Sequence, residues 1–219
     1  MEYGLQDLLH SIDLAFLKDA LTRMIAVLLC LTVHETCHGL TACALGDPTA
    51  KSRRRLSLNP LRHIDWLGLV MMLAAGFGWA KPVPVDPRYF KKPKQGMALT
   101  ALAGPVSNLL LALLAMLLSR EIYLHFLYSN GVAWLFDFIL YSLAALSIGL
   151  GIFNLLPIPP LDGAKVLGAF LPDQTYFSLM RYERYGMLVL LALSWFGVTG
   201  RLISGVIMQV YEGFFYLFY

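Results

Sequence analysis

The segment His34-Glu35-Thr36-Cys37-His38 lies inside an apolar stretch that runs from about residue 21 to residue 45. In a helix, this spacing places two imidazoles one turn apart on the same face, as ligands of one zinc ion require, with a glutamate between them as general base. Ionisable side chains are costly inside a membrane helix, so their presence there favours a functional role over a polar seam between helices. The segment therefore predicts hydrolytic zinc chemistry within a membrane protein.

The composition supports a membrane protein. Of the 219 residues, 58% are hydrophobic and 14% are charged, whereas soluble domains average about 25% charged residues. The net charge of +3 is small and concentrated in loops, which indicates membrane orientation and contact with the lipid bilayer rather than nucleic-acid binding. We predict one membrane-embedded domain over residues 21–219. Residues 1–20 are predicted to form an amphipathic segment that lies on the membrane or packs as a short soluble helix on the bundle.

Apolar segments define the predicted fold class. A membrane-spanning helix needs about 20 apolar residues. The segments 21–45, 98–118 and 132–156 are long enough, and 186–211 qualifies if Arg201 snorkels or faces protein. The segment 66–80 is shorter and contains Gly76 and Gly78. The pattern predicts an all-α polytopic membrane protein, a bundle of about four to six transmembrane helices.

Basic residues predict the orientation of these helices. The loops 46–63 and 81–97 each contain a cluster of lysines and arginines, so both are expected on the cytoplasmic side. Residues 64–80 should then dip into the membrane and return, unless this rule is violated here. His34 and His38 would lie roughly 10–17 Å below the cytoplasmic surface, given a rise of about 1.5 Å per residue.

Two loop segments predict a small β-hairpin element, cytosolic or re-entrant. Residues 51–62 partly alternate between polar and apolar side chains, and residues 81–85, Lys-Pro-Val-Pro-Val, are expected to be extended because each proline disfavours a helical predecessor. An extended edge beside a protease site could pair with an unfolded substrate strand. A plain connecting loop is the alternative.

Asp162 is the best candidate for a third zinc ligand. A catalytic zinc site typically has three protein ligands and one water molecule, and the patterns that supply a downstream ligand in soluble zinc proteases are absent after His38. Asp162 follows the prolines at 157, 159 and 160, which break the helix 132–156 at its predicted cytoplasmic end. The break could turn this carboxylate inward, and Asn154 is placed to satisfy backbone groups that the prolines leave free.

These motifs together resemble the site-2 protease family of intramembrane zinc metalloproteases, in a minimal form without a PDZ or CBS domain. The shared features are HExxH at 34–38, the sequence AGPVSN at 103–108, which is similar to the family's GxxxN signature, and NLLPIPPLDG at 154–163. The sequence GFGWAKPVPV at 76–85 also resembles that family's cytosolic hairpin. The resemblance covers about residues 22–170, which we take as the core of the peptidase domain.

The resemblance implies roles for individual residues. His34, His38 and Asp162 would bind Zn²⁺, and Glu35 would activate the water molecule. Asn108 and Asn154 would line the cleft and hold the substrate backbone or the developing oxyanion. Gly104 would permit close helix packing. The implied substrate is a single-span helix of another membrane protein, and the expected location is a prokaryotic plasma membrane with the active site toward the cytoplasm.

Two other functions are compatible with part of the pattern. Histidine and aspartate in membrane helices also mark ion pathways, so a membrane metal transporter or metal-binding protein is the main alternative. A transporter needs ligands but not a base between them, and Glu35 therefore favours the protease. An inactive relative that acts as a binding scaffold is disfavoured because all expected active-site residues are present.

Overall fold

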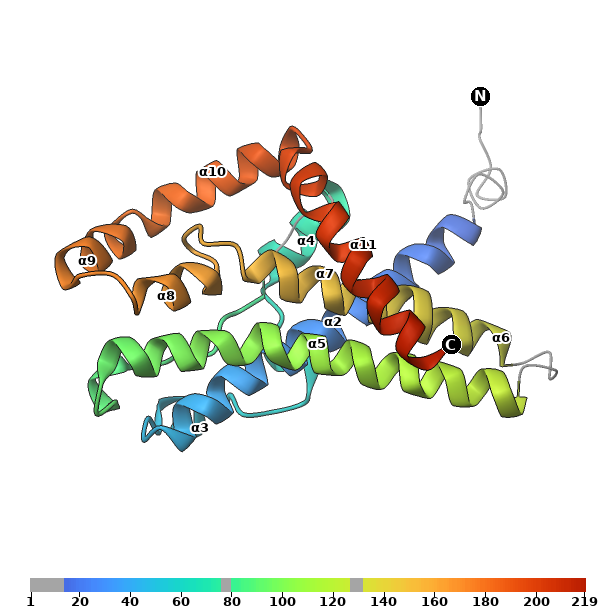
Figure 1. Ribbon diagram of the computed structural model, residues 1–219, viewed down its shortest axis with the longest axis horizontal. Helices are drawn as coiled ribbons and strands as arrows, with labels where there is room; N and C mark the ends of the chain where they lie inside the picture. The colour runs from blue at the N-terminus through green and yellow to red at the C-terminus, as the bar shows by residue number, and fades with distance from the viewer. Residues whose placement is uncertain (1–13, 76–79, 127–131) are drawn as a thin grey trace, which may run out of the picture.

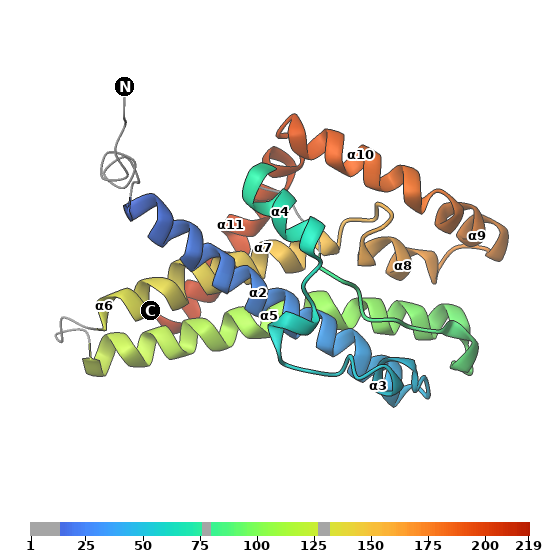
Figure 2. The ribbon, with the colours of Figure 1, turned by 180° about the vertical axis from the view of Figure 1, so that it is seen from behind.

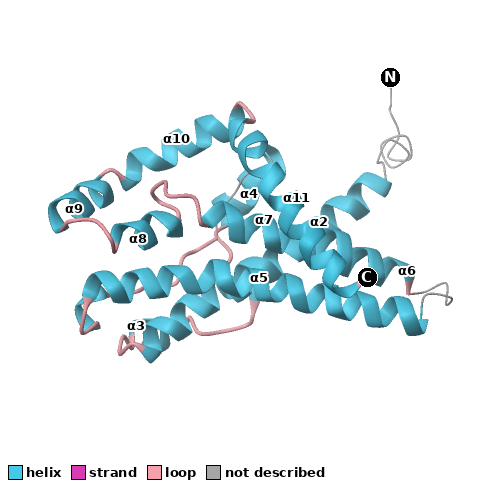
Figure 3. Cartoon of the chain, viewed as in Figure 1, coloured by secondary structure: helices cyan, strands magenta, loops and turns pink. Residues whose placement is uncertain are grey.

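The computed structural model describes residues 14–75, 80–126 and 132–219, and these are mostly helical (Figures 1 and 3). Residues 1–13 of the predicted amphipathic segment 1–20 lie outside the described residues. Residues 14–20 form the start of helix α2, Leu14–Ala44. The other long helices are α5, Pro93–Phe126, and α11, Val198–Phe218. A further run comprises α6, Ala133–Asp137, a π-helical segment η3, Phe138–Ala144, and α7, Ala145–Asn154.

The described residues contain three helices long and apolar enough to cross a membrane, or up to four if one bent pair counts as a span. The prediction of four to six is therefore not met in full. The bent pair consists of α10, Glu183–Trp195, and α11, which meet at 79°. Gly197 between them has a φ of 65°, a left-handed conformation that ends a helix and that glycine adopts without steric cost.

Helix α4, Trp66–Ala75, does not make a crossing of its own. Its ten residues span roughly 15 Å, about half of the hydrocarbon core of a bilayer. Ile64 and Ala80 form an antiparallel bridge, and the Lys81 N–H donates to the His63 carbonyl at 2.9 Å. The two ends of the segment 64–80 thus lie together, as a segment that dips in and returns requires.

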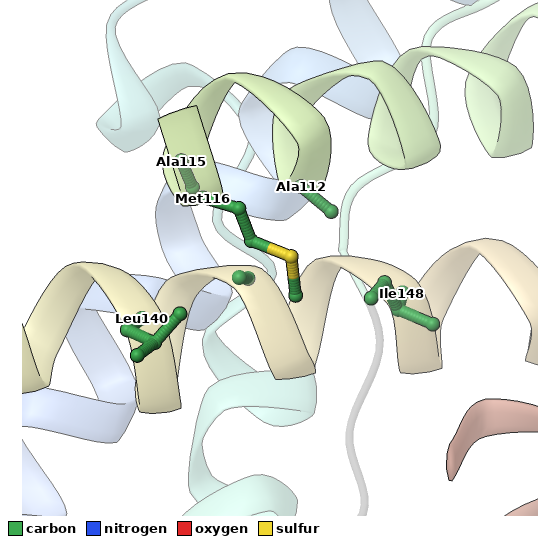
Figure 4. Packing of buried hydrophobic residues seen from close by; sticks show 6 residues of the cluster. Ala112, Ala115, Met116, Leu140 and Ile148 are labelled. Carbon is green, nitrogen blue, oxygen red and sulfur yellow. The ribbon is translucent and has the colours of Figure 1, made fainter. Parts of the chain in front are cut away.

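The apolar core lies where α5 meets η3 and α7. Met116 extends from α5 toward the facing helix, between the positions of Leu140 and Ile148 (Figure 4). These side chains are at most 1% exposed, and Ala112, Ala115 and Ala144 complete the cluster. Helix α11 crosses one face of α7 and α2 crosses the other (Figures 1 and 2). Helix α2 packs directly against α5, and the side chains of His34 and His38 on α2 meet residues of α5.

The predicted β-hairpin is not supported by the described residues, and residues 76–79 of the hairpin-like segment 76–85 lie outside them. Apart from the single bridge at Ile64, no strand forms among the described residues (Figure 3). Side chains occupy the main-chain groups that a hairpin would need: Arg55 donates to the carbonyls of Lys81 and Pro82, while the Thr36 hydroxyl donates to the Ser57 carbonyl. Proline at 82 and 84 also removes two donors from the second segment.

Short elements join the long helices. They are α3, Thr49–Ser52; the 3₁₀ turns η1, Pro60–Arg62, and η2, Pro87–Tyr89; α8, Asp162–Gly168; and α9, Asp173–Arg181. Asp47, which is fully buried, connects two of these loops. Its Oδ1 accepts the N–H and the hydroxyl of Thr49, and its Oδ2 accepts the N–H of Asp86 at 2.7 Å.

Asp47→Ala is expected to lower the thermal stability of the protein. The substitution leaves two backbone N–H groups without their acceptor, and a buried unsatisfied group costs about 1–3 kcal/mol. The midpoint of thermal unfolding in detergent should fall by several degrees. Asp173→Ala is the matched control, because Asp173 forms an ion pair with Lys94 at 2.9 Å but its side chain is 76% exposed. Equal midpoints for the two variants would contradict this role of Asp47.

Candidate metal centre

Three side chains from two helices converge on one point. His34 and His38 lie on one face of α2, and Asp162 is the first residue of α8. The Oδ2 atom of Asp162 lies 3.0 Å from His34 Nε2 and 3.2 Å from His38 Nε2. The side chains of His34, His38 and Asp162 are only 5%, 11% and 10% exposed. The two imidazole rings stand nearly perpendicular, at 87°, with centroids 4.5 Å apart.

A tight turn carries Asp162 to this position. Helix α7 ends at Asn154, and the proline-rich residues that follow reverse the chain before α8 begins. Gly163 makes the close approach possible, because a Cβ atom there would lie 2.2 Å from the Leu155 carbonyl oxygen. Thus the helix break predicted from the prolines does bring the carboxylate back against α2.

Helix α5 supports the histidines from the other side. His38 Nδ1 lies 2.7 Å from the Thr100 carbonyl oxygen, and His34 Nδ1 lies 3.3 Å from the Asn108 amide nitrogen. Gly104 lies between Thr100 and Asn108 on α5, and because it has no side chain its backbone comes close to both imidazole rings. A Cβ atom at this position would lie 2.5 Å from His38 Cε1 and 2.6 Å from His34 Nε2. The approach of α5 to the histidines therefore depends on glycine at 104.

Glu35 lies beside this cluster and is held by the segment 81–85. Its Oε2 atom accepts the Val83 N–H at 2.7 Å. Because residues 82 and 84 are prolines, Val83 is the residue among these three that has an N–H to donate. One carboxylate oxygen is thereby fixed, which orients Glu35 in the cavity next to His34 and His38.

A cavity of about 300 Å³ opens onto the cluster. Its lining combines the polar residues of the cluster with apolar side chains from the segment 81–85 and from α5. The full set is His34, Glu35, His38, Pro82, Val83, Val85, Met97, Thr100, Ala101, Asn154, Pro160, Asp162 and Lys165. The cluster and the segment 81–85 therefore face the same cavity.

The predicted site residues fall into two groups. His34, Glu35, His38, Asn154 and Asp162 all line the cavity. Asn108 does not line it and is fully buried behind the His34 ring. The Asn154 side chain donates to the Leu150 carbonyl at 2.9 Å, one turn back in its own helix.

Three further contributors were not predicted from the sequence. They are the Thr100 carbonyl, the Val83 N–H and the Lys165 ammonium group, whose Nζ lies 3.9 Å from Asp162 Oδ1. Lys165 could have been found from its position three residues after Asp162, since such neighbours share a helix face. The two main-chain groups carry no signal in residue type.

The donor set fits a zinc ion. Ligand atoms that share one tetrahedral zinc at about 2.0–2.1 Å lie roughly 3.4 Å from each other, and the nitrogen and oxygen atoms of His34, His38 and Asp162 all lie within 4.8 Å of one another. Burial raises the pKa of Asp162, but hydrogen bonds with His34 and His38 outweigh it and hold the pKa below its usual range. A lowered pKa favours the ionised carboxylate, the form that binds a metal.

Comparison with known proteins gives matches to one peptidase family and to relatives named as zinc metalloproteases. The family described as Peptidase family M50 matches residues 121–196. The chain is 38% identical over 175 residues to "Putative zinc metalloprotease YwhC" of Bacillus subtilis, covering 78% of each chain. It is 31% identical over 173 residues to "Putative zinc metalloprotease Rip2" of Mycolicibacterium smegmatis, covering 76% of this chain and 63% of that one. The Rip2 protein of Mycobacterium tuberculosis is 33% identical over 174 residues, with the same coverage. No solved structure matches this chain.

Proposed function

The chain belongs to peptidase family M50, the site-2 protease family of zinc metalloproteases, and we propose that it hydrolyses a peptide bond within or near a transmembrane segment of a membrane-protein substrate. The observation that carries this proposal is the placement of Glu35 beside His34, His38 and Asp162 on the wall of one cavity. A metal-binding cluster alone would serve transport or storage equally well. Hydrolysis also needs a general base beside the metal. Glu35 provides such a carboxylate, because it is held in place and is not one of the three converging ligands.

The residues of the chain divide the catalytic work. His34, His38 and Asp162 would hold the zinc ion, which when bound polarises a carbonyl group and lowers the pKa of a water molecule toward 7. Glu35 accepts the proton of the attacking water and later delivers it to the departing amine. The Val83 N–H keeps one oxygen of Glu35 fixed at 2.7 Å, so the other oxygen is free for this transfer. Asn154, which lines the cavity, would hold the substrate backbone or the oxyanion.

The segment 81–85 is proposed to bind the substrate in an extended form. Peptide bonds inside an intact helix are shielded by their own hydrogen bonds, so a substrate helix must unwind locally before it is cut. Val83 and Val85 line the cavity, and in an extended chain their main-chain groups point the same way. Pro82 and Pro84 offer no N–H on the opposite edge. Because Glu35 holds the Val83 N–H, pairing would use the Val83 carbonyl and the main-chain groups of Val85 on the edge that faces the cavity.

We also propose that the cavity faces the cytoplasmic side of a prokaryotic plasma membrane. The basic residues of the loops 46–63 and 81–97 support this orientation by the positive-inside rule. Lys51, Arg53 and Arg54 in the first loop are exposed, as groups that contact water and lipid headgroups would be.

Removal of metal tests the proposed function directly. The purified protein should contain about one zinc ion per chain and should cleave a model single-span substrate in detergent or liposomes. A strong chelator should abolish cleavage, and one equivalent of zinc should restore it, because the three ligands hold a single ion. Magnesium added in place of zinc is the control. Cleavage that persists in the metal-free protein would contradict the proposal.

A further inference from the structure

Asn108 lies behind His34, on the side of the ring that faces away from the cavity. Its side chain is fully buried on α5, and its amide group stands next to His34 Nδ1 while His34 Nε2 faces Asp162. The Ser147 hydroxyl donates to the Asn108 main-chain carbonyl at 2.8 Å, which fixes this part of α5 to α7. From this position Asn108 cannot touch a peptide in the cavity without displacing His34.

The chemistry of a metal-bound histidine requires an acceptor at this place. A neutral imidazole that binds metal through Nε2 carries its proton on Nδ1, and that proton needs an acceptor of its own. For His38 the acceptor is the Thr100 carbonyl, at 2.7 Å. For His34 the group at the equivalent place is the Asn108 side chain. No main-chain carbonyl is hydrogen-bonded to His34 Nδ1 in the described part of the chain.

The Asn108 amide contains an acceptor without a partner. Its Oδ1 atom is buried and makes no hydrogen bond with any described residue. The two ends of a carboxamide have nearly the same size and shape, so a half-turn about its last bond exchanges them without moving other atoms. This half-turn places Oδ1 against the His34 ring nitrogen, within hydrogen-bonding distance.

We infer that Asn108 is a positioning residue that accepts the Nδ1–H of His34 and so holds this histidine in the tautomer that binds zinc. The inference rests on the proposed function, since it assumes that zinc binds at His34, His38 and Asp162. It assigns Asn108 to the metal site rather than to substrate or oxyanion binding. Thr100 and Asn108 then play the same part for the two histidines, one through a main-chain carbonyl and the other through a side-chain carbonyl.

Zinc affinity of four proteins tests the inference. They are the wild type, Asn108→Leu, Asn108→Asp and Asn154→Leu, each stripped of metal and titrated with zinc against a competing chelator. Asn108→Leu keeps the volume but removes the acceptor, and loss of such an outer partner typically lowers metal affinity about 10- to 100-fold. Asn108→Asp keeps an acceptor oxygen and should bind zinc within a few-fold of the wild type. Asn154→Leu, which changes a cavity residue whose side chain hydrogen-bonds to the Leu150 carbonyl, should leave zinc affinity unchanged.

The same variants separate this role from a direct role in catalysis. If Asn108 donated a hydrogen bond to the substrate, both Asn108 variants would lose cleavage while binding zinc normally, and that outcome would overturn the inference. Size-exclusion profiles and thermal unfolding check that each variant folds. Should the buried aspartate prevent folding, the contrast between Asn108→Leu and Asn154→Leu in zinc affinity decides alone. Failure of the wild type to bind zinc would instead refute the proposed function.

Discussion

Glu35→Gln is expected to leave about one zinc ion bound per chain and to lower the rate of substrate cleavage by roughly 10²- to 10⁴-fold, the usual contribution of a general base or acid. Glutamine has the size of glutamate, and its Oε1 can still accept the Val83 N–H that Glu35 accepts at 2.7 Å. The segment 81–85 and the zinc ligands should therefore stay in place. Only the ability to take a proton from water is lost.

The measurement combines zinc content with cleavage of a single-span substrate under identical conditions. Glu121→Gln is the matched control, because Glu121 lies toward the other end of α5, pairs with Arg120 and is 47% exposed. It should behave like the wild type in both assays. Cleavage that survives Glu35→Gln at the wild-type rate would refute the proposed role of Glu35.

The same variant distinguishes a protease from a metal transporter. Transport across a liposome membrane depends on the ligands and on the conformations around them, not on a proton acceptor beside them. A transporter would therefore move zinc equally well with Glu35→Gln, and neither protein would cleave the substrate. Zinc retention with selective loss of cleavage is expected only for the hydrolase.

The metal cluster could be predicted from the sequence because simple geometry specifies it. Residues four apart on a helix share a face, so His34 and His38 had to point the same way. The prolines before Asp162 had to break the helix, and the turn they form returns the carboxylate to α2. The shared face and the helix break follow from local chain geometry, whereas the contact of Asp162 with α2 also depends on how the helices pack.

The surroundings of the cluster depended on features that the sequence does not display. The rotation of α5 about its own axis decides that Asn108 faces the His34 ring and not the cavity. The hairpin prediction is not supported, because alternation of side chains does not reveal that Arg55 would occupy the carbonyls of the second segment. The break between α10 and α11, in contrast, had a signal in Gly197, a residue type that commonly ends helices.

Gly104→Ala is expected to lower zinc affinity at least about 100-fold and to abolish cleavage, a larger effect than loss of an outer hydrogen-bond partner usually has. The added Cβ atom would lie 2.5 Å from His38 Cε1 and 2.6 Å from both Cε1 and Nε2 of His34. Both rings must therefore turn, or α5 must move away from α2. Movement of α5 is resisted because its central part also carries the packed core around Met116.

Helix propensity alone predicts that Gly104→Ala stabilises the protein, which is the opposite of the effect expected from the clash. Alanine is favoured over glycine inside a helix by about 1 kcal/mol, so without the clash Gly104→Ala should stabilise α5. Gly149→Ala on α7 is the control, since a Cβ atom there would meet only Ile207 Cδ1 at an ordinary 3.8 Å. Zinc titration and thermal unfolding of both variants separate the two effects. The control should bind zinc normally, whereas normal zinc binding by Gly104→Ala would show that the rings do not depend on the close approach of α5.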